Sequence, residues 1–72
     1  MIKVIIKESA FNSTGYGEKI LTSYNTDVIP RQGEFIYLSH FGMYRVLEVT
    51  HYISDDSVEN KCMWVEIEVW KK

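Results

Sequence analysis

Two histidines and one cysteine are the side chains of this 72-residue chain best suited to metal binding or nucleophilic chemistry: His40, His51 and Cys62. A zinc site needs three or four such ligands, typically with two of them separated by only two to four residues. The two histidines are eleven positions apart, and the chain has no Cys-x-x-Cys pair. The Asp55-Asp56 pair is typical of a turn whose aspartates bond the local backbone. We therefore expect no metal site and no cofactor.

Catalysis by a nucleophile needs a base within hydrogen-bonding reach and a cleft that excludes water. A short polar turn separates His51 from Cys62, which places them as neighbours across a hairpin. Glu66 and Glu68 on one strand face would lie about 7 Å apart, a separation also found between glycosidase carboxylates. A domain this small has no room for a deep cleft, however, and free cysteines are commonly small buried hydrophobes. We expect no catalytic residue, no small-molecule substrate and no enzyme activity.

The stretch from Met63 to Trp70 alternates apolar and polar positions, which is typical of a strand with one buried face. The predicted inner row is Val65, Ile67 and Val69. The predicted outer row, which we interpret as a partner-binding surface, is Trp64, Glu66, Glu68 and Trp70. Tryptophan is enriched at the energetically dominant positions of protein interfaces. This row therefore predicts a contact with another protein, either a second copy or a larger assembly.

The tyrosines support an alternative, because aromatic rings also stack on the bases of single-stranded nucleic acid. The alternative binding set is Tyr24, Tyr37 and Tyr52 with the cations Arg31 and Arg45, together with Lys3 and Lys7. A formal net charge of −2 disfavours it, since affinity for nucleic acid rises with the number of phosphates that the protein neutralises. Tyr44 is interpreted instead as a core residue.

Five short segments rich in β-branched and aromatic residues predict strands. They cover residues 2–7, 19–24, 34–39, 44–53 and 61–70. Between them lie a long loop, a turn at Val28 to Gly33, the hairpin link His40 to Met43 and a polar turn at 54–60. No segment has a convincing helical stripe. The pattern predicts an all-β fold: a small, five-stranded, strongly bent antiparallel sheet or barrel.

The fourth segment breaks the strict alternation. Tyr44 and Val46 share one face, but Val49 and His51 fall on the other unless one extra residue is inserted near Leu47. A β-bulge supplies that residue, bends the strand and increases its twist. A small sheet needs such bends to close on itself.

Length and composition limit the number of domains, the source of stability and the expected location of the protein. Seventy-two residues, 46% of them hydrophobic, predict one domain over residues 1–72 with a marginal core. A lone cysteine precludes an internal disulfide, so stability must come from apolar burial or association. No stretch approaches the roughly 18 apolar residues of a membrane span, and Lys3 and Lys7 interrupt any signal-peptide core. We expect a cytoplasmic protein that does not contact membranes.

The order of strands, loops and turns resembles that of a Src-homology-type small barrel. The stretch Pro30-x-x-Gly33-Glu34-x-Ile36 resembles the turn between a glycine and an acid that opens a central strand in many small barrels. With Tyr44-x-Val46-x-x-Val49-x-His51, it resembles short uncharacterised bacterial and phage proteins over residues 30–70. The resemblance implies a structural or accessory role in a phage or mobile element. If the protein is of phage origin, it is expected to be a component of the virion. Binding of proline-rich peptides is not implied, because the Ala-Leu-Tyr-Asp-Tyr-like segment and paired tryptophans are missing. An OB-like barrel and an open meander are the alternative folds, although the link 40–43 leaves no room for the usual OB helix.

These observations together predict a non-catalytic interaction or accessory module that associates with itself or docks on a larger protein. Single-stranded nucleic-acid binding is the alternative function.

Overall fold

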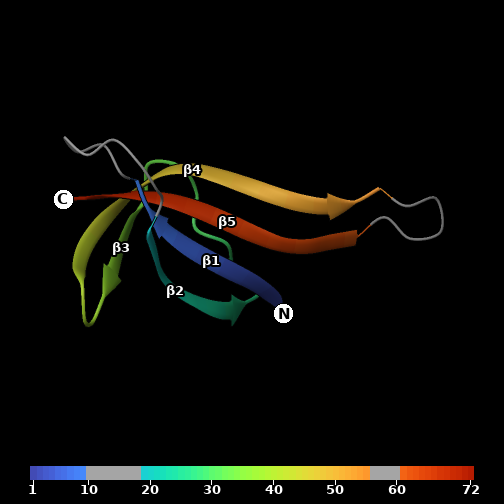
Figure 1. The fold of residues 1–72 in the computed structure, drawn as a ribbon, viewed down its shortest axis with the longest axis horizontal. Helices are drawn as coiled ribbons and strands as arrows, with labels where there is room; N and C mark the ends of the chain where they lie inside the picture. The colour runs from blue at the N-terminus through green and yellow to red at the C-terminus, as the bar shows by residue number, and fades with distance from the viewer. Residues whose placement is uncertain (10–18, 56–60) are drawn as a thin grey trace.

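The computed structural model describes residues 1–9, 19–55 and 61–72, and these form an all-β structure (Figure 1). Its strands are β1 (Ile2–Glu8), β2 (Lys19–Thr26), β3 (Phe35–Leu38), β4 (Gly42–Ser54) and β5 (Lys61–Lys71). Each lies within a few residues of a predicted strand, so the predicted fold class is confirmed. The expected long loop after β1 and the polar turn after β4 lie largely outside the described residues.

The five strands form one strongly curled sheet in the order β2-β1-β5-β4-β3 (Figure 1). Neighbouring strands are antiparallel except β1 and β5, which run parallel. The expectation of a wholly antiparallel sheet is therefore wrong for this one pair. The reason is the link from Asp27 to Glu34, which carries the chain from one edge of the sheet to the other. The meander β3-β4-β5 then brings the last strand back beside the first in the same direction.

The predicted β-bulge is present in β4. The register with β5 shifts between Val46 and Glu48, so that Leu47 is the additional residue. Tyr44 and Val46 consequently share the inner face with Val49, as the sequence predicted. Two further register irregularities, in the β1–β2 pair and near the end of β4, add to the bending of the sheet.

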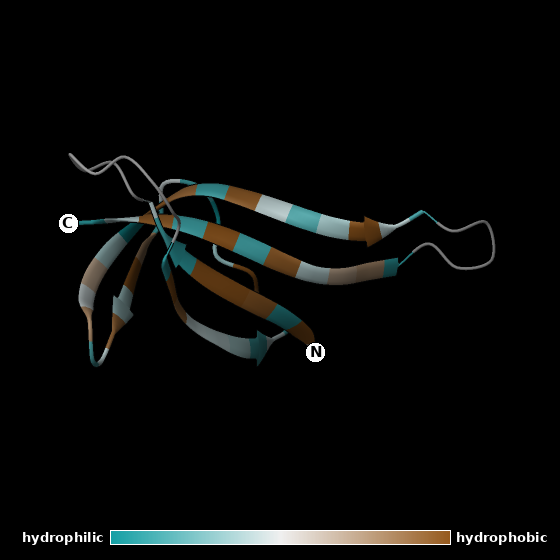
Figure 2. Cartoon of the chain, viewed as in Figure 1, coloured by the Kyte–Doolittle hydropathy of each residue, from teal (hydrophilic) through white to brown (hydrophobic). Residues whose placement is uncertain are grey.

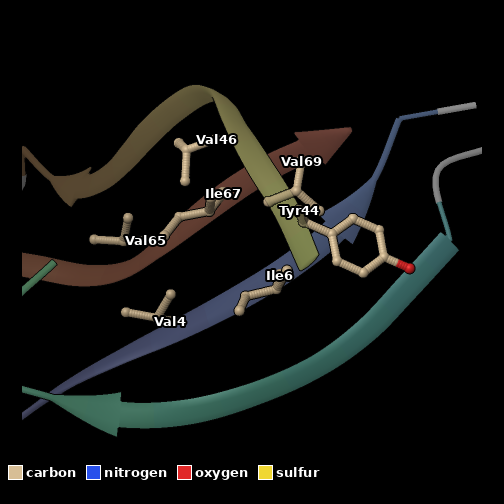
Figure 3. Packing of buried hydrophobic residues seen from close by; sticks show 7 residues of the cluster. All are labelled: Val4, Ile6, Tyr44, Val46, Val65, Ile67 and Val69. Atoms are coloured by element: carbon tan, nitrogen blue, oxygen red, sulfur yellow. The ribbon is translucent and has the colours of Figure 1, made fainter. Parts of the chain in front are cut away.

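The core lies on the inner face of the curled sheet (Figure 3). Its buried residues are Val4, Ile6, Tyr44, Val46, Val65, Ile67 and Val69. The three inner residues predicted for β5 are each 0% exposed, and Tyr44 is 3% exposed. Alternating brown and teal segments along β5 show the same division in Figure 2. The assignment of inner and outer faces in the last strand is therefore correct.

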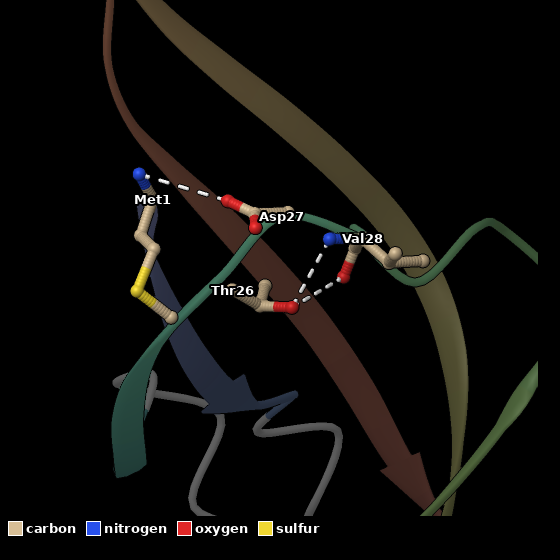
Figure 4. A network of polar contacts seen from close by, with 4 residues as sticks. All are labelled: Met1, Thr26, Asp27 and Val28. Carbon is tan, nitrogen blue, oxygen red and sulfur yellow. Dashed lines mark hydrogen bonds and ion pairs between the residues drawn. The ribbon is translucent and has the colours of Figure 1, made fainter.

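The link between β2 and β3 helps to cover this core. Ile29 packs against the buried cluster, and the backbones of Gly33 and Glu34 bond both polar groups of Val46, at 2.9 and 2.8 Å. At the start of the link, the Thr26 hydroxyl bonds the backbone of Val28, while Asp27 lies 3.6 Å from the amino terminus (Figure 4). Gly33 has a φ of 90°, which explains the glycine of the predicted turn.

The molecule is elongated because β4 and β5 extend together beyond β1 and β2 (Figure 1). Its radius of gyration is 13.3 Å, against about 11 Å for a compact chain of this length. Strand β1 pairs with β5 only from Val65 onward. Residues 52–54 and 61–64 thus form a two-stranded extension, and an isolated hairpin of this kind is marginally stable without further contacts.

Candidate functional site

The outer row of β5 divides into two environments. Trp64 is half-buried and lies on the two-stranded extension, whereas Trp70 is 42% exposed at the opposite end of the strand. Glu66 and Glu68 lie between them, and both are half-buried. The four residues share one face, as predicted, but they do not form one uniform surface.

Trp64 contributes to the structure of the extension. Its ring stacks on that of Tyr52, the residue opposite it in β4, with 4.8 Å between centroids and 19° between planes. The indole Nε1–H donates a hydrogen bond to Glu66 Oε2 at 3.0 Å. Much of the Trp64 ring is therefore in contact with other residues of the chain. Less of its surface is available to a partner than in the case of Trp70, which is more exposed.

Glu66 is neutralised by a lysine from the neighbouring strand. Its Oε1 lies 2.5 Å from Lys7 Nζ, and both side chains are only 18% exposed. Hydrogen bonds from Lys7 and from Trp64 hold the pKa of the Glu66 carboxyl below its ordinary value, although burial acts in the opposite direction. Glu66 is thus part of a paired cluster within the molecule and is not a solvated acidic side chain.

This pair makes stability depend on pH. Because the folded-state pKa of Glu66 is lowered, the carboxylate stabilises the fold above its ordinary pKa, and this contribution disappears as the pH falls through the lowered value. We expect Lys7→Met to raise the pKa of Glu66 and to destabilise the fold by about 1–3 kcal/mol at pH 7. Urea unfolding at pH 7 and pH 3 measures the effect. Lys3→Met, at an exposed position on the same strand, is the matched control; equal losses in both variants would refute the assignment.

Strand register brings a group of exposed apolar side chains together on the outer face of β3, β4 and β5. Phe35 pairs with Arg45, which pairs in turn with Trp70, and Tyr37 pairs with Met43 in the adjacent row. We call Phe35, Tyr37, Met43 and Trp70 the aromatic patch. Their exposed fractions are 55%, 69%, 39% and 42%. Apolar side chains of this size are usually more deeply buried, so their clustering marks a candidate contact surface.

Cations accompany the aromatic patch. Arg45 is exposed between Phe35 and Trp70, and Lys72 Nζ lies 4.6 Å from the centroid of the Phe35 ring. Lys71 points to the other face, where its ammonium lies 5.0 Å from the Tyr44 ring centroid and donates to the carbonyl of Phe41. The patch therefore combines aromatic rings with two positive charges, although the net charge of the whole chain is −2.

The residues of the nucleic-acid alternative are dispersed. Tyr37 and Arg45 lie at the aromatic patch, but Tyr52 is stacked on Trp64 and Arg31 lies in the link before β3. Tyr24 lies opposite Val4 on the inner face, where desolvation by burial raises the pKa of its hydroxyl. The sequence reasoning missed Phe35 and Met43. The alternation of Phe35 with Tyr37 indicates that the two rings share one face of a strand. The strand pairings that bring Met43 and Trp70 to the same surface cannot be read from the sequence.

The candidate catalytic and metal-binding residues do not converge. In β4 and β5, His51 lies opposite Val65, and Ile53 lies opposite Cys62. The expected pairing of His51 with Cys62 is therefore wrong, because the register of β4 with β5 sets Cys62 opposite Ile53, two residues beyond His51. Cys62 is half-buried, with its Sγ 3.6 Å from the carbonyl oxygen of Trp64. Across residues 1–9, 19–55 and 61–72, no three His, Cys, Asp or Glu side chains gather in a metal-binding arrangement.

A cavity of about 660 Å³ lies between the link and β4. Residues 27–32 line one side, and Glu48, Val49 and His51 line the other. Its walls mix charged and apolar groups and lie apart from the aromatic patch.

Comparison with known proteins found no matching family model, curated protein or solved structure. In the part of the chain that the structure describes, no helix is long and apolar enough to cross a membrane.

Proposed function

We propose that this chain is a non-catalytic protein-interaction module whose contact surface is the aromatic patch. The observation that carries the proposal is the exposure of three aromatic rings and a methionine in neighbouring rows of one sheet face. Exposed apolar patches of this extent on monomeric proteins are often functional. The proposal retains Trp70 from the row predicted in the sequence and assigns Trp64 a structural role.

The charges around the patch support a specific contact. Arg45 and Lys72 lie among the rings, and aromatic residues together with arginine are the residues most enriched where interfaces gain their binding energy. A partner that covers the rings must also supply negative charge to compensate these cations. The patch thus offers both apolar area and directional charge, which specific recognition requires.

Trp70→Ala tests the proposal. We expect the variant to remain folded, with a loss of stability within about 1 kcal/mol, and to bind its partner at least about tenfold more weakly. Association is measured by light scattering during size-exclusion chromatography for self-association, and by capture from the native host for other partners. Ile20→Ala removes an exposed apolar side chain outside the patch, 64% exposed on β2, and is the control.

A partner retained by Ile20→Ala but lost by Trp70→Ala would support the aromatic patch as the contact surface. If Trp70→Ala associates as strongly as the unchanged protein, the proposed function is wrong. If instead the variant unfolds, Trp70 is a structural residue and the patch is not a binding surface.

Single-stranded nucleic-acid binding is a second candidate, because Tyr37 and Arg45 lie beside two further exposed rings. Only two side-chain cations accompany the patch, and counterion release from two phosphates contributes a salt slope of roughly −1.4, which is small. Titration with a single-stranded oligonucleotide at 50 mM salt tests this candidate. An unchanged tryptophan emission would exclude it.

A further inference from the structure

We infer that the partner presents an extended acidic segment, which pairs with the outer edge of β3 and covers the aromatic patch. This inference rests on the proposed function and adds to it the chemistry and conformation of the bound segment. Three independent features support it: the edge position of β3, the charges beside it and the area of the patch.

Strand β3 is the last strand of the sheet on one side, and in the described residues it pairs with β4 alone. An edge strand carries a row of backbone N–H and C=O groups that can accept a further strand. Proteins block such edges with charged residues, prolines or bulges, or keep the edge strand very short. Strand β3 is short, with four residues. Phe35–Leu38 contains no charged residue or proline, and its register with β4 is continuous. Strand β2, at the opposite edge, has a register irregularity that interrupts its ladder with β1.

A strand added to β3 would place every second side chain on the outer face, about 4.8 Å from β3. These side chains would contact Phe35 and Tyr37, which alternate on that face in the same way. Peptide recognition by strand addition works in this manner, with backbone pairing providing affinity and alternate side chains providing specificity.

The charges indicate which side chains fit. Arg45 and Lys72 both lie on this face, and the patch itself contains no carboxylate. Glu48 and Glu68 lie in the next row of the same face, in β4 and β5, beyond the segment of β4 that pairs with β3. The neighbouring Glu34 directs its carboxylate to the backbone N–H of Arg31, at 2.6 Å, within the turn that precedes β3. The cations closest to β3 are therefore Arg45 and Lys72, so an added strand with acidic side chains would be favoured over one with lysines.

The size of the patch favours a short segment over a second folded copy. If a fully exposed aromatic side chain has about 200 Å² of surface, the three exposed rings present on the order of 300 Å². A stable interface between folded proteins buries about 800 Å² on each partner. Single-stranded nucleic acid fits less well, because its backbone cannot continue the hydrogen-bonding ladder of a strand edge.

The test uses the full chain labelled with ¹⁵N and three synthetic peptides, acetylated and amidated. The first is (Glu-Val)₄, the second is (Lys-Val)₄, and the third is (Glu-Val)₄ with alternate backbone nitrogens methylated to block pairing along one edge. We expect (Glu-Val)₄ to shift the amide resonances of β3 and the Trp70 indole, and to slow amide exchange in β3. The lysine and methylated peptides should bind at least tenfold more weakly.

The double variant Arg45→Gln, Lys72→Gln should weaken binding of (Glu-Val)₄ several-fold, whereas Ile20→Ala should not.

Each contrary result has a distinct meaning. Equal binding of (Lys-Val)₄ would overturn the acidic preference, and equal binding of the methylated peptide would overturn strand pairing. Shifts confined to β2, or no binding of any peptide at about 1 mM, would overturn the inference as a whole. In those cases the proposed function would still stand if Trp70→Ala abolishes partner association, because that result does not depend on the conformation of the partner. An oligonucleotide that shifts the β3 resonances when (Glu-Val)₄ does not would replace the inferred peptide with nucleic acid.

Discussion

Ile67→Ala is expected to destabilise the fold by about 3–4 kcal/mol, within the range observed for large-to-small core substitutions. Ile67 is 0% exposed, and in the register of the sheet it lies between Ile6 of β1 and Val49 of β4. Truncation removes apolar burial and leaves a cavity at the centre of the sheet, where neighbouring strands restrict relaxation. A chain of this length has a total stability of roughly 4–11 kcal/mol, so the variant should be close to unfolding at 25 °C.

Urea unfolding followed by far-ultraviolet circular dichroism measures this change. Ile53→Ala is the matched control, because Ile53 is 59% exposed on the two-stranded extension. Its stability should remain within about 0.5 kcal/mol of that of the unchanged protein. A loss below about 1 kcal/mol for Ile67→Ala would contradict the inner-face assignment of β5.

Trp64→Ala is expected to destabilise the fold by about 2–3 kcal/mol, whereas Trp70→Ala should have a much smaller effect. The half-buried Trp64 ring loses its stacking contact with Tyr52 and its hydrogen bond to Glu66. Aromatic pairs contribute about 0.5–1.5 kcal/mol beyond the area they bury. Because no third strand of the described residues pairs with residues 52–54 and 61–64, the two-stranded extension should fray first.

Amide hydrogen exchange localises this effect. Exchange should accelerate most in the two-stranded extension of Trp64→Ala, and in β1 and the centre of β5 by no more than the loss of global stability accounts for. Trp64→Phe keeps a ring against Tyr52 but removes the indole donor to Glu66, so its stability should lie between those of the alanine variant and the unchanged protein. If Trp70→Ala is the more destabilising of the two alanine variants, the roles assigned to the two tryptophans are reversed.

The two tryptophans of β5 have different roles, although they lie on the same face of one strand. Both indoles belong to the outer row of one strand, yet one supports the extension and the other lies in the aromatic patch. The difference follows from their neighbours in β4: Trp64 faces an aromatic residue that can stack, while Trp70 faces Arg45. A single exposed row of a strand can thus combine structural and recognition roles.

The sequence by itself was sufficient to predict the fold class, the strand segments and the inner face of β5. Strict alternation identifies a face because successive side chains of a strand point in opposite directions. The interruption of that alternation at Leu47 was also sufficient to predict the bulge in β4, since one extra residue is the simplest way to return Val49 to the face of Val46.

Tertiary structure alone decided which residues meet across strands. The parallel pairing of β1 with β5 brings Lys7 to Glu66, and the link from Asp27 to Glu34 determines that pairing by moving the chain to the far edge of the sheet. Likewise, Phe35 and Trp70 share a surface only because both pair with Arg45. Periodicity within a segment reports the face on which a side chain lies, but it carries no information about register between segments distant in the chain. For this reason the composition of the aromatic patch became visible only in the folded structure.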